Sequence, residues 1–222
     1  YMVAKQRGTL VGVQGVIPQS HFDKYLPKAQ IFLTLWKVLE TKGIGIGLRL
    51  YQNILKEYKP NFIGVIGINQ EIIPFYKWQG FTVGIMNHHV ALPPDVTKLK
   101  IAKVPEALRS QSRKIKLDVS FQKVSEKYFA KIDTKELYIH QWPLKSDIYI
   151  LNRYINHPVY TYEVYAISKN NKLRSLCVIR PIFKDNSVVL RFVDFIGPNE
   201  AFSLLHNFVL DLLKKYNAEY LD

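Results

Sequence analysis

The stretch ETKGIGIGL (residues 40–48) carries glycines at three alternate positions, Gly43, Gly45 and Gly47. It follows a segment rich in β-branched and aromatic residues, 31–39, and precedes apolar residues at helical spacing. We therefore expect it to join a strand to a helix. Glycines allow a tight turn and a close approach of a ligand to the backbone, and the free amides of a helix start favour a phosphate group. A plain strand-to-helix turn would show the same pattern.

Two common phosphate-binding loops do not fit this stretch. No Gly-Lys-Ser/Thr follows the glycines, so it is not a Walker A loop. The glycine spacing also differs from the dinucleotide-binding fingerprint, and the next predicted strand lacks the acidic residue that holds the ribose. A different phosphate-bearing ligand has to be considered.

On both sides of the glycine stretch, alternating and periodic apolar patterns predict the elements of the first 92 residues. The expected strands are 1–4, 10–17, 31–39, 62–68 and 81–90, with a hairpin turn at Arg7-Gly8, and the expected helices are 48–58 and 71–78. The region 93–116 contains paired prolines and many charges, and we place a connector between two domains there.

The second half, 117–222, shows the same order of elements about 155 to 160 residues further on. Its expected parts are strands 162–168, 173–183 and 188–196, a break at Gly197-Pro198, a helix over 202–216 and a strand from Glu219. This predicts an internal structural repeat whose second copy stops inside a strand at Asp222.

A second motif, NQEIIPFYKWQGF (residues 69–81), follows the predicted strand 62–68. It has an Asn at the strand end, a Tyr seven residues later and then Gly-Phe. Together with the glycine stretch, it resembles the GNAT acetyltransferase superfamily over residues 1–92. That family's cofactor loop reads Gln/Arg-x-x-Gly-x-Gly/Ala, and Lys42, Gly45 and Gly47 occupy those places.

The resemblance implies the fold class and the cofactor. We expect an α/β (α+β) fold, with a mixed, mostly antiparallel sheet and flanking helices, repeated as a second, degenerate unit. Residues 1–92 would form the acyl-CoA-binding domain, without the family's first strand and acceptor-lining helices. The co-substrate would be acetyl-CoA or another acyl-CoA, and no metal is expected. In the second unit Gly197-Pro198 removes a donor amide and stiffens the loop, so we do not expect it to hold CoA.

The resemblance also implies roles for single residues. Amides from Gly43 to Gly47 would hold the CoA pyrophosphate, and Lys42, where the family prefers Gln or Arg, would weaken that binding because it lacks forked donors. The other implied roles are main-chain pairing of Lys37 and Val38 with pantetheine, steadying of that arm by Asn69 and proton donation to the thiolate by Tyr76. A core aromatic residue is the alternative interpretation of Tyr76.

The base that deprotonates the amine is less defined. The candidates are His21, Glu40, His88 and His89, and we select His88 because it lies on the predicted strand after Phe81 and imidazole titrates near neutral pH. An ordered water is the alternative. No third ligand accompanies the His pair, which argues against a metal site.

Composition indicates which partners and which cellular compartment to expect. The net charge of +13 indicates an anionic partner, either a phosphate-rich cofactor, a nucleic acid or an anionic membrane face, although an AT-rich genome also favours Lys. No apolar run approaches the roughly 20 residues of a membrane span, and no signal peptide is visible. Cys177 is the only cysteine and lies in an apolar run, which favours a core position and a reducing, cytoplasmic compartment. The chain begins without Met, so we expect a fragment of a longer protein.

Three functions follow from these features. The first is acyl transfer from CoA to a primary amine such as an amino sugar, free or nucleotide-linked, because the chain is similar to tandem GNAT proteins of bacterial surface-polysaccharide biosynthesis. The others are an aminoacyl-tRNA-dependent transferase of the peptidoglycan-bridge type and a non-catalytic binding module. We expect no nucleic-acid partner for the first, and a homodimer is left open. Residues 152–158, NRYINHP, are either an acceptor-facing patch or a solvated helix end.

Overall fold

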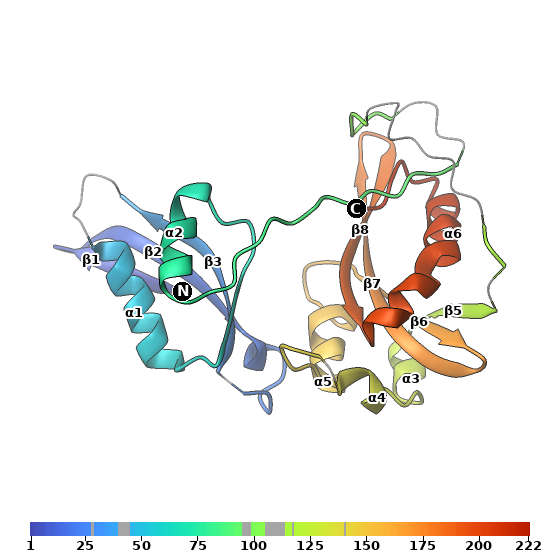
Figure 1. Ribbon diagram of the computed structural model, residues 1–222, viewed down its shortest axis with the longest axis horizontal. Coiled ribbons are helices and arrows are strands. Elements are labelled where there is room, and N and C mark those ends of the chain that lie inside the picture. The colour runs from blue at the N-terminus through green and yellow to red at the C-terminus, as the bar shows by residue number, and fades with distance from the viewer. Residues whose placement is uncertain (28, 40–44, 95–98, 105–113, 117, 140) are drawn as a thin grey trace. The chain divides into compact units, whose positions relative to one another are not determined.

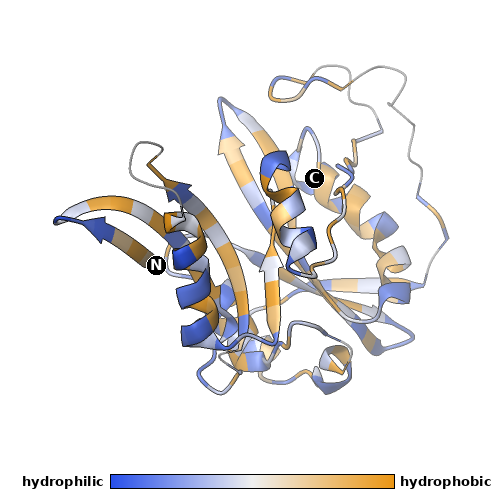
Figure 2. Cartoon of the chain, turned by 60° about the vertical axis from the view of Figure 1, so that its left-hand side comes forward, coloured by the Kyte–Doolittle hydropathy of each residue, from blue (hydrophilic) through white to orange (hydrophobic). Residues whose placement is uncertain are grey.

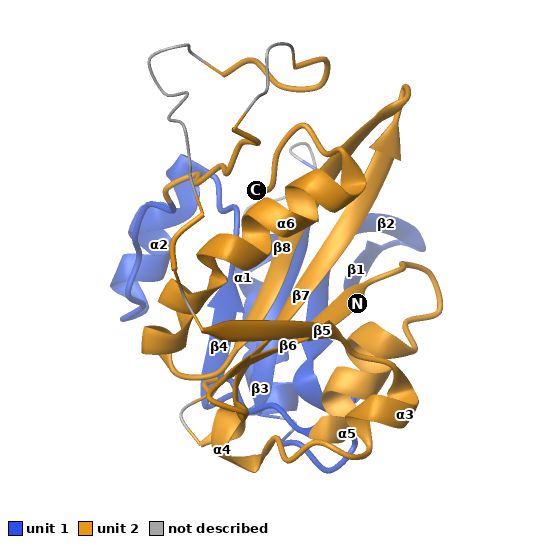
Figure 3. Ribbon diagram, turned by 90° about the vertical axis from the view of Figure 1, so that its right-hand side faces the viewer, with its two compact units in different colours: residues 1–86, 143–146 blue, residues 87–142, 147–222 orange. Residues whose placement is uncertain are grey.

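The chain folds into two compact units, shown in different colours in Figure 3. The computed structural model describes residues 1–27, 29–39, 45–94, 99–104, 114–116, 118–139 and 141–222. Unit 1 comprises residues 1–86 and 143–146, and unit 2 comprises residues 87–142 and 147–222. The predicted connector at 93–116 lies partly outside the described residues and stays a prediction.

Unit 1 is built on a four-stranded sheet whose strands follow one another in chain order (Figure 1). Its elements are β1 (Met2–Gln6), β2 (Thr9–Pro18), the 3-10 helix η1 (Gln19–His21), β3 (Gln30–Val38), α1 (Ile46–Tyr58), β4 (Phe62–Val65), the 3-10 helix η3 (Gln70–Ile72) and α2 (Ile73–Trp78). The first three strands are antiparallel, whereas β4 joins β3 in parallel after the crossover through α1.

Local sequence explains the first elements of unit 1. Arg7 and Gly8 both adopt positive φ, 48° and 81°, which is the two-residue hairpin turn that suits the twist of β1 and β2. Helix α1 turns its apolar stripe toward the sheet and its charged residues toward solvent (Figure 2). It buries Tyr51 and Ile54 against the β3 residues Ile31 and Leu33.

A β-bulge interrupts the pairing of β2 with β3. Gln14 lies opposite Trp36, but Val16 lies opposite Leu33, so β3 carries one extra residue at this point. A side chain at Gly15 would clash with Thr34 Oγ1, which explains the glycine on the partner strand.

The extra residue changes which side chains of β3 face α1. Without it, Leu35 would share the face of Leu33, because side chains alternate along a strand. Leu35 is instead 60% exposed, whereas Trp36 stacks on Tyr51 of α1. The bulge therefore places Trp36 beneath the helix.

Unit 2 has a second four-stranded sheet, entirely antiparallel in the order β5-β6-β7-β8. Its elements are β5 (Val119–Lys123), α3 (Glu126–Phe129), α4 (Lys135–Tyr138), α5 (Asp147–Ile150), the π-helix η5 (Leu151–Ile155), β6 (Glu163–Lys169), β7 (Lys172–Lys184), β8 (Ser187–Ile196), the 3-10 helix η6 (Asn199–Leu205) and α6 (His206–Tyr216). Phe208, Leu212 and Leu213 of α6 pack in the core of this unit.

The C-terminal segment 219–222 lies parallel to β8, as expected of a strand. Glu219 N donates to Val188 O at 2.8 Å, and Leu190 N donates to Tyr220 O at 2.9 Å. Ala91 forms an antiparallel bridge to Leu221 on the other side. Residues 219–222, predicted as the start of a strand, form bridges at Leu221 only, and they take the place beside β8 that β4 takes beside β3.

Both third strands carry a bulge. In β8 the register shifts between the pair Ile179–Phe192 and the pair Val178–Asp194, so Val193 is the extra residue. Hairpin, bulged third strand and helix therefore occur in the same order in each unit. In each unit the helix is followed by a segment parallel to the third strand, β4 in unit 1 and residues 219–222 in unit 2.

The expected fold class is confirmed: two mostly antiparallel four-stranded sheets with flanking helices make a mixed α/β structure. The predicted strand 81–90 is wrong, because this segment is irregular and pairs with no strand among the described residues. Its apolar alternation fits a strand, but Ile85 is 95% exposed and Met86 74% exposed. A strand needs a partner edge for its main-chain groups, and this segment has none in the described part of the chain.

The sequence pattern also missed β5 and the four-residue helices α3, α4 and α5, which are too short to show a period. No helix among the described residues has the length and apolar character needed to cross a bilayer.

The bulge in β3 predicts the effect of a small substitution. Gly15→Ala should lower the free energy of unfolding by about 1–3 kcal/mol, because the added methyl group overpacks against Thr34. Adding Thr34→Ala should recover most of that loss. Urea unfolding measures both, with Gly84→Ala as the control, since a side chain at Gly84 meets nothing within 4 Å. Equal midpoints for Gly15→Ala and Gly84→Ala would contradict the packing described here.

Candidate functional site

The two parallel strands of unit 1 separate at one end. Their pairing runs from Gln30 opposite Phe62 to Leu33 opposite Val65, where β4 ends. Strand β3 continues to Val38 and is paired there only with β2. Among the described residues, no strand covers this part of β3 on the β4 side.

The direction of the main-chain groups on this open edge follows from one hydrogen bond. Leu39 N donates to Val11 O at 3.0 Å, so the main-chain groups of Leu39 point toward β2. Successive residues of a strand point their N–H and C=O groups to opposite edges. The main-chain groups of Lys37 therefore also point toward β2, and those of Val38 and Trp36 point to the open edge. Of the predicted pair, Val38 faces this edge, and Trp36 takes the place expected for Lys37.

Helix α1 begins beside the end of β3. Gly45 precedes its first residue with a φ of 89°, and no side chain in the described part of the chain caps this end. The first amides of a helix have no partner within it, and the helix dipole adds partial positive charge there. A side chain at Gly45 would meet nothing within 4 Å, so the space above it is open among the described residues. Lys42 and Gly43, predicted to contribute here, and Glu40 lie outside the described residues.

The glycine at position 47 is explained by packing. A Cβ atom at Gly47 would come within 3.2 Å of the indole of Trp36. Its lack of a side chain therefore lets Trp36 pack against the first turn of α1.

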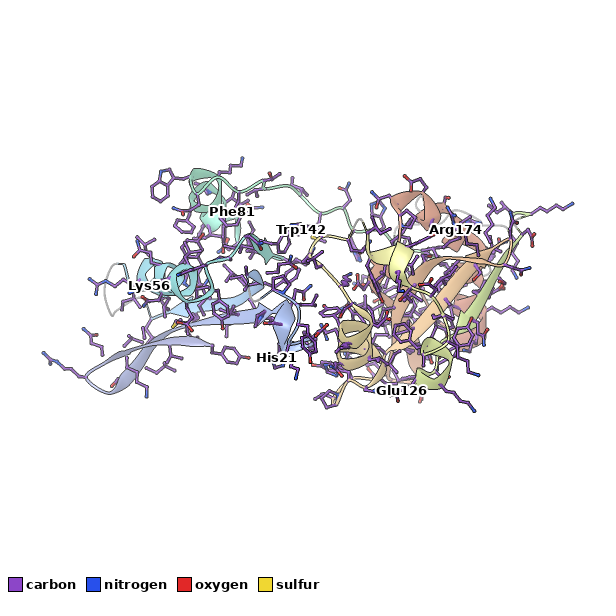
Figure 4. All side chains as sticks on the ribbon, turned by 90° about the horizontal axis from the view of Figure 1, so that it is seen from below. His21, Lys56, Phe81, Glu126, Trp142 and Arg174 are labelled. Carbon is purple, nitrogen blue, oxygen red and sulfur yellow. The ribbon has the colours of Figure 1, made fainter. Side chains whose placement is uncertain are left out.

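Trp36 belongs to an aromatic cluster made of Trp36, Tyr51, Phe75, Tyr76 and Phe81. Neighbouring rings in this cluster have centroids 5.3 to 6.3 Å apart. The rings come from β3, α1 and α2 and from the residue labelled in Figure 4 just after α2. The motif 69–81 thus supplies three of the five rings, those of Phe75, Tyr76 and Phe81.

Tyr76 is buried in the cluster, with 3% of its surface exposed. Burial, with a smaller contribution from Tyr51, raises the pKa of Tyr76 to about 12. Its hydroxyl is therefore protonated at neutral pH and can donate a hydrogen bond.

Asn69 serves a local purpose. Its side-chain Oδ1 accepts a hydrogen bond from Glu71 N at 3.2 Å and caps η3. Its Nδ2 lies 3.5 Å from Glu71 Oε2. The amide is exposed, so a ligand would have to compete with these contacts.

The candidate histidines His21 and His88 belong to different units. His21 packs edge-on against Phe22 with ring centroids 5.0 Å apart in unit 1. His88 belongs to unit 2, where its Nε2 lies 3.5 Å from Asp222 Oδ2. Because residues 81–90 form no strand, His88 does not lie on the strand predicted for it. Within the described ranges, no three His, Cys, Asp or Glu residues gather as a metal-binding group.

Gln14 is a buried polar residue that the motifs did not indicate. It is fully buried opposite Trp36, and neither its Oε1 nor its Nε2 has a hydrogen-bond partner among the described residues. An unpaired buried amide costs about 1–3 kcal/mol, so it calls for an explanation. A glutamine inside the apolar run LVGVQGVIP was the available signal.

Comparison with known proteins gives no sequence match: no protein-family model and no curated protein matches the chain. Structural matches do exist. Two structures of N-myristoyltransferase from Saccharomyces cerevisiae, one with myristoyl-CoA and one with myristoyl-CoA and inhibitors, match with TM-scores of 0.46 and 0.45 and identities of 10% and 9%. They cover 99% and 97% of this chain and 59% of each enzyme.

A GCN5-related N-acetyltransferase from Anabaena variabilis ATCC 29413 matches with a TM-score of 0.54 and 14% identity. The match covers 99% of this chain and 54% of that chain, so the chain spans little more than half of that enzyme. At this identity the likeness concerns the fold alone. The chain has the fold of a GCN5-related N-acetyltransferase.

Proposed function

We propose that unit 1 binds an acyl-CoA, acetyl-CoA in the simplest case, and transfers the acyl group to a primary amine. The observation that carries this proposal is the edge of β3 beside the start of α1, which the described residues leave open and uncapped. The fold likeness to an N-acetyltransferase supports it.

The two features suit the two ends of CoA. The pantetheine arm is extended and carries two amides, so it can add to the edge of β3 through the main-chain groups of Trp36 and Val38, in the way a strand adds to a sheet. The diphosphate can then meet the amides at the start of α1, with Lys42, Gly43, Gly45 and Gly47 as its proposed loop. The net charge of +13 also favours such an anionic ligand.

The reaction is an exchange of a thioester for an amide. The amine nitrogen attacks the thioester carbonyl carbon, the new C–N bond forms and the C–S bond breaks. The amine loses one proton and the sulfur gains one. Holding both reactants in one orientation supplies much of the rate.

Tyr76 is the proposed donor to the sulfur. A thiol has a reference pKa near 8.5, below the value of about 12 for Tyr76. Full transfer of the tyrosine proton to a thiolate would therefore cost about 5 kcal/mol. A hydrogen bond from the hydroxyl avoids this cost, so we assign Tyr76 the stabilisation of the leaving sulfur. Because His88 belongs to unit 2, an ordered water is the proposed acceptor of the amine proton, and the released thiolate takes its proton from solvent.

We infer that unit 2 is a duplicated copy without a cofactor site. The shared order of elements and the matching bulges in β3 and β8 support the duplication. In place of the glycine stretch, unit 2 has Gly197 and then Pro198 before η6. A Cβ atom added at Gly197 would come 2.7 Å from Arg174 O.

The proposed acceptor of the acyl group is an amino sugar, nucleotide-linked and used in surface-polysaccharide biosynthesis in the cytoplasm.

A binding role without catalysis is the second candidate. It is favoured by the burial of Tyr76 and by the engagement of the Asn69 amide with Glu71. The turnover measurement with Tyr76→Phe below separates the two candidates.

Acetyl-CoA should stabilise the chain. At a concentration about one hundred times its Kd, a ligand adds about 2.7 kcal/mol, which corresponds to a rise in Tm of about 5 °C or more. Gly45→Ala should lose this rise, because its methyl group enters the space above the helix start and its φ of 89° is strained. Gly8→Ala introduces similar strain at φ 81° in the hairpin and should keep it. Differential scanning fluorimetry measures both; no rise for the wild type at millimolar acetyl-CoA would refute the proposal.

Tyr76→Phe should lower kcat at least tenfold (about 1.4 kcal/mol) and leave the KM for acetyl-CoA nearly unchanged, because the lost hydrogen bond forms as the sulfur leaves. Since the pKa of Tyr76 is raised to about 12, its protonated form persists, and no loss of rate from its ionisation should occur up to about pH 10. Steady-state kinetics with several amines tests this, and Tyr58→Phe on α1 is the control. Turnover by Tyr76→Phe equal to wild type would leave Tyr76 a packing role only.

Gln14→Met should raise the free energy of unfolding by about 1 kcal/mol, because it removes an unpaired buried amide at similar volume. The same substitution should slow acyl transfer, since a site retains such a group at the expense of stability when a ligand uses it. Urea unfolding and turnover are measured together. A drop in stability would mean that Gln14 already has a partner within the protein.

A further inference from the structure

Unit 2 contains a group of cationic and aromatic side chains that the proposed acyl transfer does not use. We call it the Arg153 cluster: Arg153, His157, Tyr160, Tyr162 and Arg180. Its members come from the π-helix η5, from the segment between η5 and β6, and from β7. π-Helical turns are rare and occur frequently at functional sites.

Ring stacking holds the two arginines in place. The Arg180 guanidinium lies 3.9 Å from the centroid of the Tyr160 ring. The Arg153 guanidinium lies 5.8 Å from the Tyr162 ring centroid, and its Nη1 is 3.5 Å from the Tyr162 hydroxyl. A guanidinium on a ring face keeps its N–H donors in the plane of the group, where they can still bind an anion. Tyr160 is 44% exposed, so solvent reaches the cluster.

His157 links the two sides of the cluster. Its ring stacks on Tyr160 at 5.3 Å and meets Tyr162 edge-on. Its Nδ1 accepts hydrogen bonds from Val159 N at 3.1 Å and from Tyr160 N at 2.9 Å. The neutral ring therefore carries its proton on Nε2, which is a further donor. Burial, together with the charges of Arg153 and Arg180, lowers the pKa of His157 and favours this neutral form.

The charges around Arg180 are unbalanced. It lies directly opposite Arg191 in the pairing of β7 with β8, and like charges in such positions repel. Arg191 is paired with Asp222 at 3.2 Å, whereas Arg180 has no ion pair with any acidic residue in the described ranges. Asp194, the acid on the neighbouring strand, accepts a hydrogen bond from the Tyr154 hydroxyl at 2.6 Å. A bound anion would relieve this imbalance.

We propose that the Arg153 cluster is a phosphate-binding site, in which Arg153, Arg180 and the Nε2–H of His157 donate to the phosphate oxygens. Phosphate fits better than carboxylate because it offers more acceptor oxygens, spread in three dimensions, to donors that come from three segments. Arginine forks match phosphate geometry. This site is separate from the proposed CoA site in unit 1 and does not depend on it.

The His157 imidazole gives a local readout that unit 1 cannot mimic. Its NMR resonances, assigned by their loss in His157→Gln, are followed in the full chain during titration with inorganic phosphate at constant ionic strength. Phosphate should raise the pKa of His157, because it offsets the two positive charges that lower it. Arg180→Gln should weaken phosphate binding at least tenfold. Arg174→Gln, on the same strand and labelled in Figure 4, should bind as the wild type does.

Three outcomes would overturn the proposal. They are an unchanged His157 resonance in phosphate, an equal loss of binding in Arg174→Gln and Arg180→Gln, and an equal response to succinate, which would assign the site to carboxylates. If Arg180→Gln does not fold, Arg180→Lys keeps the charge, loses the fork and should show the same weakening. Saturation with CoA should leave the His157 titration unchanged, so the two proposals fail independently.

Discussion

The end of pairing between β3 and β4 is the constraint on which the candidate site depends. Parallel strands joined by a helix normally stay paired, because each unpaired main-chain group loses a hydrogen bond. Here the pairing ends at Leu33 and Val65, while β3 continues to Val38 along β2. The open edge presents donors and acceptors that an extended ligand with amides can satisfy.

The bulge in β3 couples this edge to the packing below it. One extra residue opposite Gly15 shifts the alternation, so Trp36 turns its side chain toward α1 and its main-chain groups toward the open edge. Trp36 thus packs against Gly47 at the start of the helix and also borders the proposed ligand path. Bulges often redirect strands next to binding sites, and this one joins the helix start, the aromatic cluster and the edge in one place.

The sequence predicted the parts of this arrangement that depend on local pattern. The hairpin turn at Arg7-Gly8, the end of α1 at Tyr58 and the strand before the glycines all follow from periodicity and turn chemistry. The strand predicted at 81–90 failed because pairing needs a distant edge, which no local pattern records. The direction of the main-chain groups of Lys37 is hidden from the sequence for a related reason, since a bulge reverses main-chain direction without any mark in the residues around it. The buried amide of Gln14 likewise acquires meaning only once Trp36 is seen opposite it.

Hydrogen exchange of single amides on β3 tests the open edge most directly. In the free protein, Val38 N–H should exchange at least tenfold faster than Lys37 N–H, because Lys37 is bonded to β2 and Val38 faces the uncovered side. Saturating acetyl-CoA should slow the exchange of Val38 and leave that of Lys37 unchanged. Equal protection of the two amides in the free protein, or no change at Val38 with ligand, would contradict the account.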